Sequence, residues 1–597
     1  MKQLFSVLKK DVKLIRPAIS RVIRSFSRME RIVFFVFLWI FIIGSVLLAS
    51  YANKTLMVEV PASGGSVSEG VVGVPRFINP LLAISDADRD LTTLIYSGLM
   101  RANADGSLVP DIAETYNISE DGLVYSFTLK ENLFFHDGMP ITVDDILFTV
   151  SKAQDQTLKS PKRASWGGVV AENASDEITN RITFTLNKPY APFLENTTLG
   201  ILPKHIWENA SSDQFSFSQF NINPIGSGPY KIDRIERNSS GIPDYYDLVP
   251  FRKFILGKPY IEKLRLRFYA NEESLADGLR NNEISGANAI QPKTAEQFGE
   301  NGFFIRQSPL PRVFGVFFNQ NQSSVFADLA VRKALNYATD KERIIDEVLH
   351  GYATIIDSPI PPGSLGYIET KNNKADTEAA SLMSDSDKEI TSLERAKKIL
   401  SDNGWKANEE DGILEKKIKD EVLRLEFSLS TSDISELKEV AQRIKEDWGR
   451  IGANVTIKVF ETGDLNQNVI RPRKYDALLF GEVVGRDSDL FAFWHSSQRN
   501  DPGLNIALYA NISSDKLLED ARSISDTEVR IQKYKEFQEE IKSDIPAVFI
   551  YAPNFIYILP KNINGVSFGK AAVPSERFLN IHKWFIETDS VWKIFDK

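Results

Sequence analysis

The chain has 597 residues and no cysteine, which excludes disulfide bonds, thiolate metal sites and a lipid anchor on cysteine. With 43% hydrophobic and 25% charged residues, the composition is that of a globular protein and argues against long disorder. The net charge of −9 is divided unevenly, because residues 1–31 carry +7 and the remainder carries −16. The acidic remainder argues against nucleic acid as a partner, since phosphate binding needs clustered positive charge.

The first predicted element is a membrane-spanning helix at residues 32–52, an uncharged apolar run of 21 residues. Positive charge stays on the cytoplasmic side, so residues 1–31 are predicted to form a cytoplasmic tail that contacts anionic lipid. The alternative is a cleaved signal peptide, with Ser50 and Ala52 at the positions before a cut at Asn53. The long basic segment and the length of the run favour a retained anchor.

Beyond the membrane, residues 53–70 are rich in Ser, Gly and Val and predict a flexible linker. From Val71 onward, strands and helices alternate, which predicts an α/β fold. Residues 124–129 and 182–186 alternate between apolar and polar side chains and predict half-buried strands.

Two helices in the middle of the chain have clear capping residues. Asp328 and Asp340 are predicted N-caps, and Gly351 follows the end of the second helix. Residues 441–455 predict a helix that stops at Gly452 and continues as a strand, and residues 371–390 predict a polar surface insertion.

The sequence has no recognisable catalytic or metal-binding motif. Its five histidines are scattered, and it contains neither a paired zinc motif, a nucleophile elbow nor a phosphate-binding loop. The segment from Asp86 to Asp90 imitates the start of a calcium loop, but Leu91 occupies the position that requires glycine. We therefore predict no enzymatic activity, no cofactor and no metal site, and interpret Asp86 as the start of a helix.

A series of short segments, in their order and spacing, resembles the dipeptide- and oligopeptide-binding family of extracellular solute-binding proteins, the receptors of ABC importers. The resemblance covers residues 70–590. The segments are Pro75-Arg-Phe-Ile-Asn-Pro80, Leu94-Ile-Tyr-Ser-Gly-Leu99, Pro110-Asp-Ile-Ala-Glu114, Phe135-His-Asp-Gly-Met-Pro140, Leu202-Pro-Lys-His-Ile206, Ile225-Gly-Ser-Gly-Pro-Tyr-Lys231, Phe317-Phe-Asn319, Val331-Arg-Lys-Ala-Leu335, Tyr475-Asp476 and Asp544-Ile-Pro546.

The resemblance implies a two-lobe α/β fold of the periplasmic-binding-protein type, with a hinge and a ligand buried between the lobes. The first lobe is expected at residues 71–310, with an extra subdomain at about 104–200. The second lobe is expected at residues 311–545, and residues 546–597 return to the first lobe.

The implied function is peptide binding by hinge closure, followed by recognition of the closed protein by a membrane permease. The family also contains receptors for nickel complexes and oligosaccharides, so the ligand class stays open. A tethered peptide sensor or chaperone is a second alternative. Monomer is the default state of the family.

The resemblance fails at the residue that often binds the peptide amine, an Asp in a Gly-Trp-x-x-Asp stretch. Here Glu482 occupies the Trp position and Gly485 the Asp position. Arg486, Asp487 and Asp489 follow at once and are candidate ligand-binding residues. Asp487 could replace the amine anchor from a shifted position, whereas Arg486 would favour a carboxylate. The alternative is that Arg486 pairs with its neighbours on a solvated loop.

Four more candidates follow from the resemblance. Trp494 and His495 are a pair that could stack on a ligand and hydrogen-bond to it, although a core position for Trp494 is the alternative. By position in the family, Asp86 in the segment 83–90 and Arg312 before the second lobe are expected to border the cleft.

Overall fold

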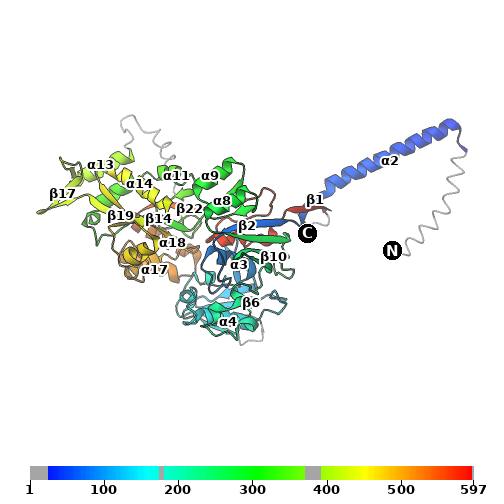
Figure 1. Cartoon of the computed structure of the whole chain (residues 1–597), viewed down its shortest axis with the longest axis horizontal. Helices are drawn as coiled ribbons and strands as arrows, with labels where there is room; N and C mark the ends of the chain where they lie inside the picture. The colour runs from blue at the N-terminus through cyan, green and yellow to red at the C-terminus, as the bar shows by residue number, and fades with distance from the viewer. Residues whose placement is uncertain (1–24, 174–179, 370–390, 594–597) are drawn as a thin grey trace. The chain divides into compact units, whose positions relative to one another are not determined.

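The computed structural model describes residues 25–173, 180–369 and 391–593, and it divides into two units. One unit combines residues 1–62 with 587–597, and the other is the body formed by residues 63–586 (Figure 1). The predicted insertion at 371–390 and most of the predicted tail at 1–31 lie outside the described residues.

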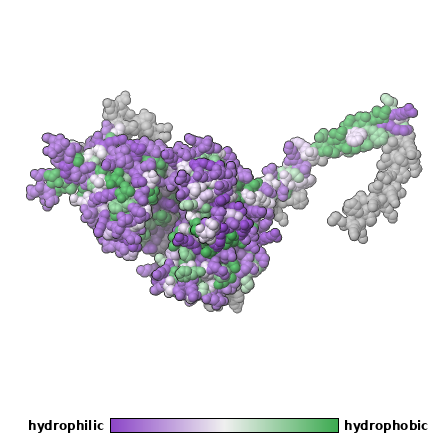
Figure 2. Space-filling view, in the orientation of Figure 1, coloured by the Kyte–Doolittle hydropathy of each residue, from purple (hydrophilic) through white to green (hydrophobic). Residues whose placement is uncertain are grey.

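Among its described residues, the terminal unit forms a long helix and a pair of strands. Helix α2 (Arg28–Leu56) is capped by Ser27, whose Oγ accepts a hydrogen bond from the Glu30 amide. By length and composition it could cross a membrane, and Figure 2 shows it as a band of apolar surface. Strand β1 (Met57–Ala62) follows at once and pairs antiparallel with β23 (Glu587–Trp592) over six residue pairs.

These strands correct the predicted flexible linker at 53–70. Helix α2 continues to Leu56, β1 follows, and β2 (Ser66–Val72) is a strand of the main sheet. The segment is ordered because its backbone groups find partners in β23 and β11 (Lys263–Tyr269), which lie far away in sequence. Local composition carries no signal of those partners.

A twelve-stranded sheet runs through the body and joins its two lobes. Strand β22 (Ala547–Leu559) belongs to both lobes: residues 547–553 pair with β14 (Arg312–Phe318) and β15 (Ala353–Ile355). Residues 554–559 pair instead with β13 (Phe304–Pro309) and β12 (Gly286–Ala287). The remaining strands are β9 (Tyr230–Arg237) and β10 (Pro243–Pro250) beside β11, and β19 (Glu426–Ser432), β20 (Asn454–Phe460) and β21 (Ala477–Val483) beside β14.

The chain passes from the hydrophobic core of one lobe to that of the other at two points. Leu310 and Phe555 belong to the first-lobe core, whereas Val313 and Ala552 belong to the second. The second-lobe core therefore continues past the predicted boundary at 545, because the first half of β22 pairs with second-lobe strands. Figure 1 shows both lobes around this strand.

Helices cover the sheet in each lobe, and small sheets are attached to it. The first lobe contains α3 (Asp86–Ile95), α8 (Glu272–Arg280), α9 (Pro292–Glu300) and the short 3-10 helix η6 (Pro574–Phe578). The second lobe contains α10 (Leu329–Ala338), α11 (Lys341–Glu347), α13 (Ser392–Asp402), α14 (Ser435–Gly449), α16 (Phe491–Trp494), α17 (Ile512–Ser523), α18 (Thr527–Asp544) and the sheet β16 (Lys406–Ala407), β17 (Leu414–Ile418), β18 (Glu421–Arg424).

Within the range expected for the extra subdomain, a four-stranded sheet packs with its own helices. The order of the sheet is β5-β6-β8-β7. The elements of this region are β3 (Met100–Ala102), β4 (Leu108–Pro110), β5 (Ala113–Ile118), β6 (Val124–Leu129), α4 (Val143–Gln154), α5 (Arg163–Trp166), β7 (Val170–Asn173), β8 (Arg181–Thr185), α6 (Phe193–Asn196) and α7 (Lys204–Trp207).

The predictions that rest on short-range sequence patterns agree with the structure. The predicted strands appear as β6 and β8, with Tyr125, Phe127 and Phe184 buried on the apolar face. Asp328 and Asp340 cap α10 and α11 through hydrogen bonds to the amides of Ala330 and Arg343. The expected turn at Gly452 has φ +87°, a conformation that glycine adopts without strain.

A fully buried ion-pair network holds the first lobe together. The Arg577 guanidinium donates to both carboxylate oxygens of Asp90, at 2.8 and 2.7 Å, and to Glu69 Oε1 at 3.1 Å. The Tyr557 hydroxyl donates to Glu69 Oε2 at 3.0 Å. Burial raises the pKa of Glu69 to about 7, and the Arg577 charge opposes that rise. The network therefore joins β2, α3, β22 and η6 through groups that have no access to water.

The network predicts that Arg577→Met strongly destabilises the folded protein. Removing one partner leaves two buried carboxylates unpaired, so we expect a loss of about 3–5 kcal/mol in unfolding free energy. Urea unfolding of the full chain in lipid nanodiscs, followed by tryptophan fluorescence, measures the change.

Arg280→Met is the matched control, because Arg280 is half exposed and pairs with Asp277 on the surface of α8. We expect a change of about 1 kcal/mol or less there. Equal effects of the two substitutions would contradict a structural role for the buried network.

Candidate functional site

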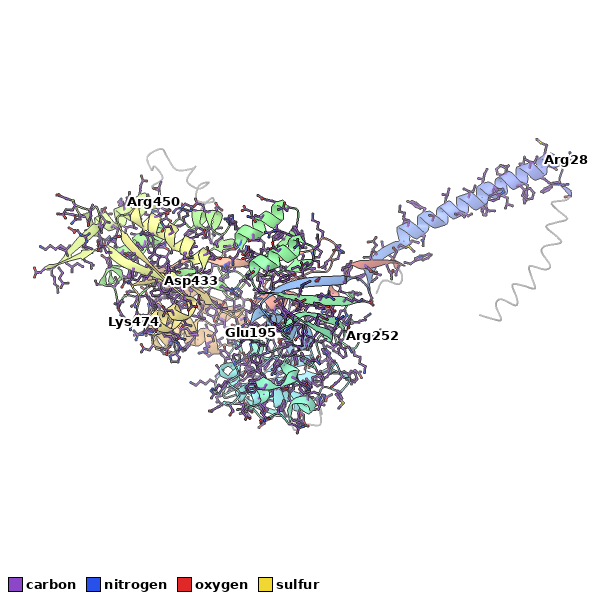
Figure 3. The ribbon with its side chains drawn as sticks, in the orientation of Figure 1. Arg28, Glu195, Arg252, Asp433, Arg450 and Lys474 are labelled. Carbon is purple, nitrogen blue, oxygen red and sulfur yellow. The ribbon has the colours of Figure 1, made fainter. Side chains whose placement is uncertain are left out.

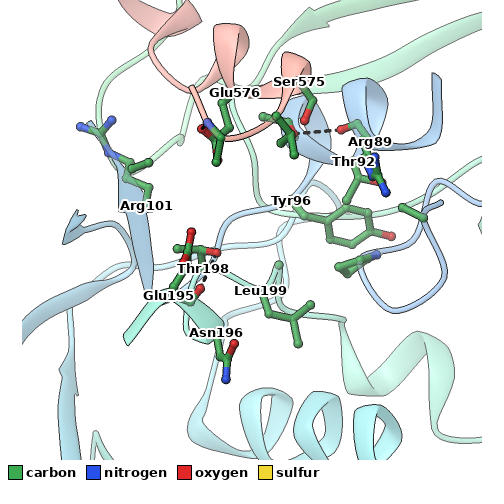
Figure 4. A pocket seen from close by; sticks show the side chains of 18 of the residues that line it. Arg89, Thr92, Tyr96, Arg101, Glu195, Asn196, Thr198, Leu199, Ser575 and Glu576 are labelled. Carbon is green, nitrogen blue, oxygen red and sulfur yellow. Dashed lines mark hydrogen bonds between the residues drawn. The ribbon is translucent and has the colours of Figure 1, made fainter. Parts of the chain in front are cut away.

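A cavity of about 690 Å³ opens between the two lobes. The first lobe contributes residues of α3 and α6, the segment 98–102 and the segment 572–579, and the second lobe contributes Val483 and Gly485. Figure 2 shows the surface hollowed where the lobes meet, and Figure 4 shows the cavity from close by. Its size fits a small organic solute or a short peptide.

Helix α3 presents one polar face to this cavity. Its N-terminus is fixed by a capping box, in which Ser85 Oγ accepts from the Asp88 amide. Ala87, Leu91 and Leu94 point into the first-lobe core. The opposite positions, at helical spacing, line the cavity with Arg89, Thr92, Thr93 and Tyr96. Asp90 on this helix is held by Arg577, so the buried network fixes the cavity wall.

A cluster of charges connects the lobes at the edge of the cavity. Arg486 of the second lobe donates to Glu576 Oε2 at 2.5 Å and lies 3.8 Å from Glu195 Oε1, and both glutamates belong to the first lobe. Burial raises the pKa of Glu195 to about 7, although the Arg486 charge opposes the rise. In Figure 3, Glu195 lies where the two lobes meet.

A second polar contact joins the subdomain to the second lobe. The Tyr190 hydroxyl donates to Asp489 Oδ2 at 3.1 Å, and Arg522 Nη2 lies 3.3 Å from the same oxygen. The Ala191 amide donates to the carbonyl of Arg522 at 2.9 Å. The contacts between the lobes at this point are therefore hydrogen bonds and ion pairs.

Two of the predicted site residues lie beside the cavity wall. Asp86 is exposed at the start of α3 and lies 3.6 Å from Arg89. Arg312 is half-buried, and no acceptor in the described chain reaches its Nε. Burial lowers the pKa of Arg312, and the charge of Asp86 acts in the opposite direction. The structure thus brings Asp86, Arg89 and Arg312 into one neighbourhood.

The segment after Gly485 is tied down by ion pairs and does not lie on a solvated loop. Arg486 connects the lobes, as described above. Asp487 accepts hydrogen bonds from Arg530 of α18, one of them from Nη1 at 3.2 Å, and Asp489 is bound by Tyr190 and Arg522. These carboxylates already have cationic or hydroxyl partners, so neither is free to bind a ligand amine in this conformation.

Trp494 and His495 require a correction. Trp494 is fully buried in the second-lobe core, where its ring packs near Phe317, Tyr509 and Phe549. His495 stacks on Phe491 with ring centroids 4.1 Å apart, and its Nε2 lies 3.4 Å from Glu519. Neither residue lines the cavity. The short helix α16 turns its apolar side inward, which makes Trp494 a packing residue.

Sequence reasoning missed Lys162, Glu195 and Glu576. All three line the cavity, but they come from distant segments. No local pattern marks them, because their proximity depends on the packing of the subdomain and of the C-terminal return. The face of α3 could have been found, since Arg89, Thr92 and Tyr96 recur at helical spacing. Among the described residues, no three His, Asp or Glu side chains group as a metal site.

Glu482 is a buried acid without a partner. It is 3% exposed on β21, and neither carboxylate oxygen has a hydrogen bond within the described residues. It lies opposite Val313 in the sheet, and Val313 belongs to an apolar core. Burial raises the pKa of Glu482 well above its ordinary value. The position at which the family's stretch has tryptophan therefore holds a carboxyl group that faces the core.

Comparison with known proteins identifies one group of relatives. The sequence model described as "Bacterial extracellular solute-binding proteins, family 5 Middle" matches residues 107–502. The oligopeptide-binding protein AppA of Bacillus subtilis is 28% identical over 537 residues, which cover 88% of this chain and 92% of AppA.

Solved structures share the fold. That of Bacillus subtilis AppA in complex with a nonapeptide has a TM-score of 0.64 at 26% identity and covers 88% of this chain and all of the other. The substrate-binding protein CtaP of Listeria monocytogenes has a TM-score of 0.71 at 27% identity, covering 88% and 99%. NikZ of Campylobacter jejuni with Ni(L-His) has a TM-score of 0.66 at 26% identity, covering 87% and 99%. The two-lobe α/β fold is that of these proteins.

Glu482 predicts a specific dependence of stability on pH. Because the folded-state pKa is raised, the native protein holds this proton more tightly than the unfolded chain does. The unfolding free energy of the native protein should therefore fall, relative to Glu482→Gln, as pH rises above the ordinary glutamate value of about 4.5. At pH 7, Glu482→Leu should stabilise the protein by about 1–3 kcal/mol, since it removes an unsatisfied buried polar group.

Urea unfolding of the full chain in nanodiscs at pH 5, 6, 7 and 8 measures both effects. Glu439→Gln, an exposed change on α14, is the control and should show no such trend. A stability difference between the native protein and Glu482→Gln that stays constant with pH would show that Glu482 is hydrated in solution.

Proposed function

Because the chain belongs to the bacterial extracellular solute-binding proteins of family 5, we propose that it is the membrane-anchored substrate-binding component of an ABC importer and that it binds peptides. The observation that carries this proposal is the cavity of about 690 Å³ between the lobes, to which both lobes contribute. The similarity to AppA, an oligopeptide-binding protein, supports a peptide as the ligand. The family is one of solute-binding proteins, and no chemical step on the ligand is part of the proposal.

We propose that the ligand is captured by hinge closure. The chain passes between the lobes at Leu310-Pro311 and at Pro553, where the Leu310 amide donates to the Pro553 carbonyl at 2.9 Å. A rotation that bends these two crossings leaves both hydrophobic cores intact. The contacts made by Arg486 and Asp489 would break on opening, and each of these groups can be solvated in the open form. Closure would exclude water from the cavity and strengthen its polar contacts.

We also propose that the N-terminal segment is retained as a membrane anchor with the body on the extracytoplasmic side. In favour of retention, the alternative cut after Ala52 falls inside α2, which continues to Leu56. The Trp592 indole also donates to Asn53 Oδ1 at 2.8 Å, next to that cut. A tether would keep the receptor at high effective concentration near its permease, so weak docking could suffice. The basic tail would then contact anionic lipid on the inner face.

The proposed function is tested with the full chain purified from membranes in nanodiscs. Native mass spectrometry measures which members of an equimolar pool of synthetic peptides, two to nine residues long, remain bound. We expect peptides to be retained and to raise the midpoint of thermal unfolding. The intact mass of the same sample should include residues 1–52.

A nickel–histidine complex is the comparison ligand, because the NikZ structure holds Ni(L-His). Retention of this complex, with no peptide bound, would overturn the peptide assignment and leave the receptor function. A protein that binds neither probe nor any solute from its native membrane extract would contradict the receptor function.

The interlobe charges predict that closure depends on pH. Glu195 faces Arg486, Asp487 and Glu576 in the closed form, and its pKa of about 7 exceeds the ordinary value that it would regain when exposed. The closed form therefore binds the proton more tightly, so closure should strengthen as pH falls from about 7.5 to about 5 and weaken above 7.

Energy transfer between two dyes, one on each lobe, measures closure. The chain has no cysteine, so two introduced cysteines can carry the dyes. Ser240→Cys and Glu409→Cys place exposed labels on the two lobes. Glu195→Gln should remove most of the pH dependence, whereas Glu208→Gln, an exposed change near α7, should preserve it. Closure that does not vary with pH would contradict the role given to Glu195.

A further inference from the structure

A groove on the first lobe, separate from the cavity between the lobes, is rich in positive charge. Its volume is about 470 Å³. Four cations and two carboxylates line it, namely Lys231, Arg252, Lys253 and Lys258 with Asp137 and Glu262. We call this surface the basic groove. In Figure 3, Arg252 lies at the outer edge of the first lobe, away from Glu195.

Both carboxylates of the basic groove already have partners. Glu262 pairs with Lys258 at 3.5 Å, and Asp137 pairs with His205 at 2.8 Å. Among the described residues, the other three cations of the groove form no ion pair. The groove therefore carries positive charge that the protein itself does not neutralise.

This lack of partners is confined to one end of the sheet. Three arginines farther along the same strands pair with carboxylates. The pairs are Arg234 with Glu236, Arg265 with Asp247, and Arg267 with Asp244 and Glu283. Cations on this sheet are thus generally matched by acids, except where the basic groove lies.

The basic groove lies at the end of the sheet where the chain enters the body. Strand β2 begins at Ser66, which lies beside Lys263 in the parallel strand β11. Strands β10 and β9 follow in antiparallel order, which places Val249 and Lys231 side by side at the same end. Neighbouring strands are about 4.8 Å apart, so Lys231 lies about 14 Å from Ser66 along this edge.

The chain also leaves the body at this end. Gly65 packs against Ile586, and the Phe585 and Tyr260 rings lie with centroids 6.3 Å apart. Residues 57–62 connect α2 to the body and span no more than about 25 Å when fully extended. If α2 is retained as an anchor, the end of the body that carries the basic groove is held within that distance of the end of the membrane helix.

The charge of the remaining chain gives this position a consequence. Residues 32–597 carry a net charge of −16, so an anionic bilayer repels most of the body. It attracts lysine and arginine side chains that come within a Debye length of its surface. A body tethered at its basic end therefore has one electrostatically favoured orientation.

We propose that the basic groove binds the phosphate headgroup of an anionic phospholipid and thereby orients the anchored body on the bilayer. Guanidinium and ammonium groups are suitable donors to phosphate oxygens. None of the residues of the groove lines the cavity between the lobes, so lipid and solute would occupy separate sites. The inference rests on the retained anchor of the proposed function.

The test uses the full chain in nanodiscs of phosphatidylcholine, with or without phosphatidylglycerol. A single introduced cysteine carries a dye, and the acceptor is attached to lipid headgroups. Met139→Cys places the dye on an exposed residue next to the groove, whereas Ser240→Cys places it in the turn at the far end of β9 and β10. We expect phosphatidylglycerol to raise energy transfer from the Met139 position at least twofold and not from the Ser240 position.

The test variant replaces the three unpaired cations by glutamine: Lys231→Gln, Arg252→Gln and Lys253→Gln. It should lose the increase while keeping the thermal unfolding midpoint and the solute binding of the native protein. The control makes the same change of charge at three exposed positions of the second lobe: Lys406→Gln, Lys417→Gln and Lys438→Gln. It should keep the increase. Raising the salt concentration to about 1 M, where the Debye length is about 3 Å, should abolish the increase in the native protein.

The outcomes separate this inference from the proposed function. Equal energy transfer in neutral and anionic bilayers, or an increase that the test variant retains, would overturn the lipid site while the receptor stands. An orientation that appears only with a co-purified permease would also overturn it and assign the groove to a protein partner.

A mature chain that lacks residues 1–52 would refute the anchor. Sedimentation of that chain with vesicles of the same two lipid compositions then decides the lipid site. Binding to anionic vesicles that the test variant loses would support it, and no binding would overturn it.

Discussion

The buried pairing of Arg577 with Asp90 and Glu69 determines how the first lobe can assemble. All three groups are fully buried, so each charge is tolerable only in the presence of the others. Arg577 lies in η6 near the C-terminus, Asp90 in α3 and Glu69 in β2, the first strand of the body. The first lobe is therefore complete only when the end of the chain packs against its beginning. Because α3 and the segment 572–579 line the cavity, the same pairing also positions the candidate ligand site.

The contacts between the two lobes differ in kind from the contacts within each lobe. Within each lobe, large apolar clusters hold the elements together, whereas the contacts of Arg486, Tyr190 and Ala191 across the gap are polar. Apolar surfaces would resist separation, but ion pairs exchange readily for water. The proposed hinge closure would depend on this division between permanent cores and reversible contacts.

Sequence reasoning succeeded where the determining interactions are local. The alternation of Tyr125 and Phe127 and the capping by Asp328 depend on neighbours within a few residues, and both appear in the structure as predicted. The ordered strand β1 was missed because its partner, β23, lies more than 500 residues away. Trp494 was misassigned because its type suits either a core or a ligand contact, and only the packing around Phe317 and Phe549 decides between them.

The candidate site was predictable only in part for the same reason. The family resemblance led to the segment around Asp86, next to Arg89, but Lys162, Glu195 and Glu576 reach the cavity through the assembly of three distant segments. The departure at Gly485 was visible in the sequence. Its consequence was not, because the partners that hold Asp487 and Asp489 come from other segments: Arg530, Tyr190 and Arg522.

A crystal structure of the full chain loaded with its co-purified solute would test the central claim most directly, that the solute binds in the cavity walled by α3, the segment 572–579 and the second lobe. The account predicts a solute enclosed between the lobes and in contact with both. A solute bound to one lobe alone, or outside this cavity, would contradict it.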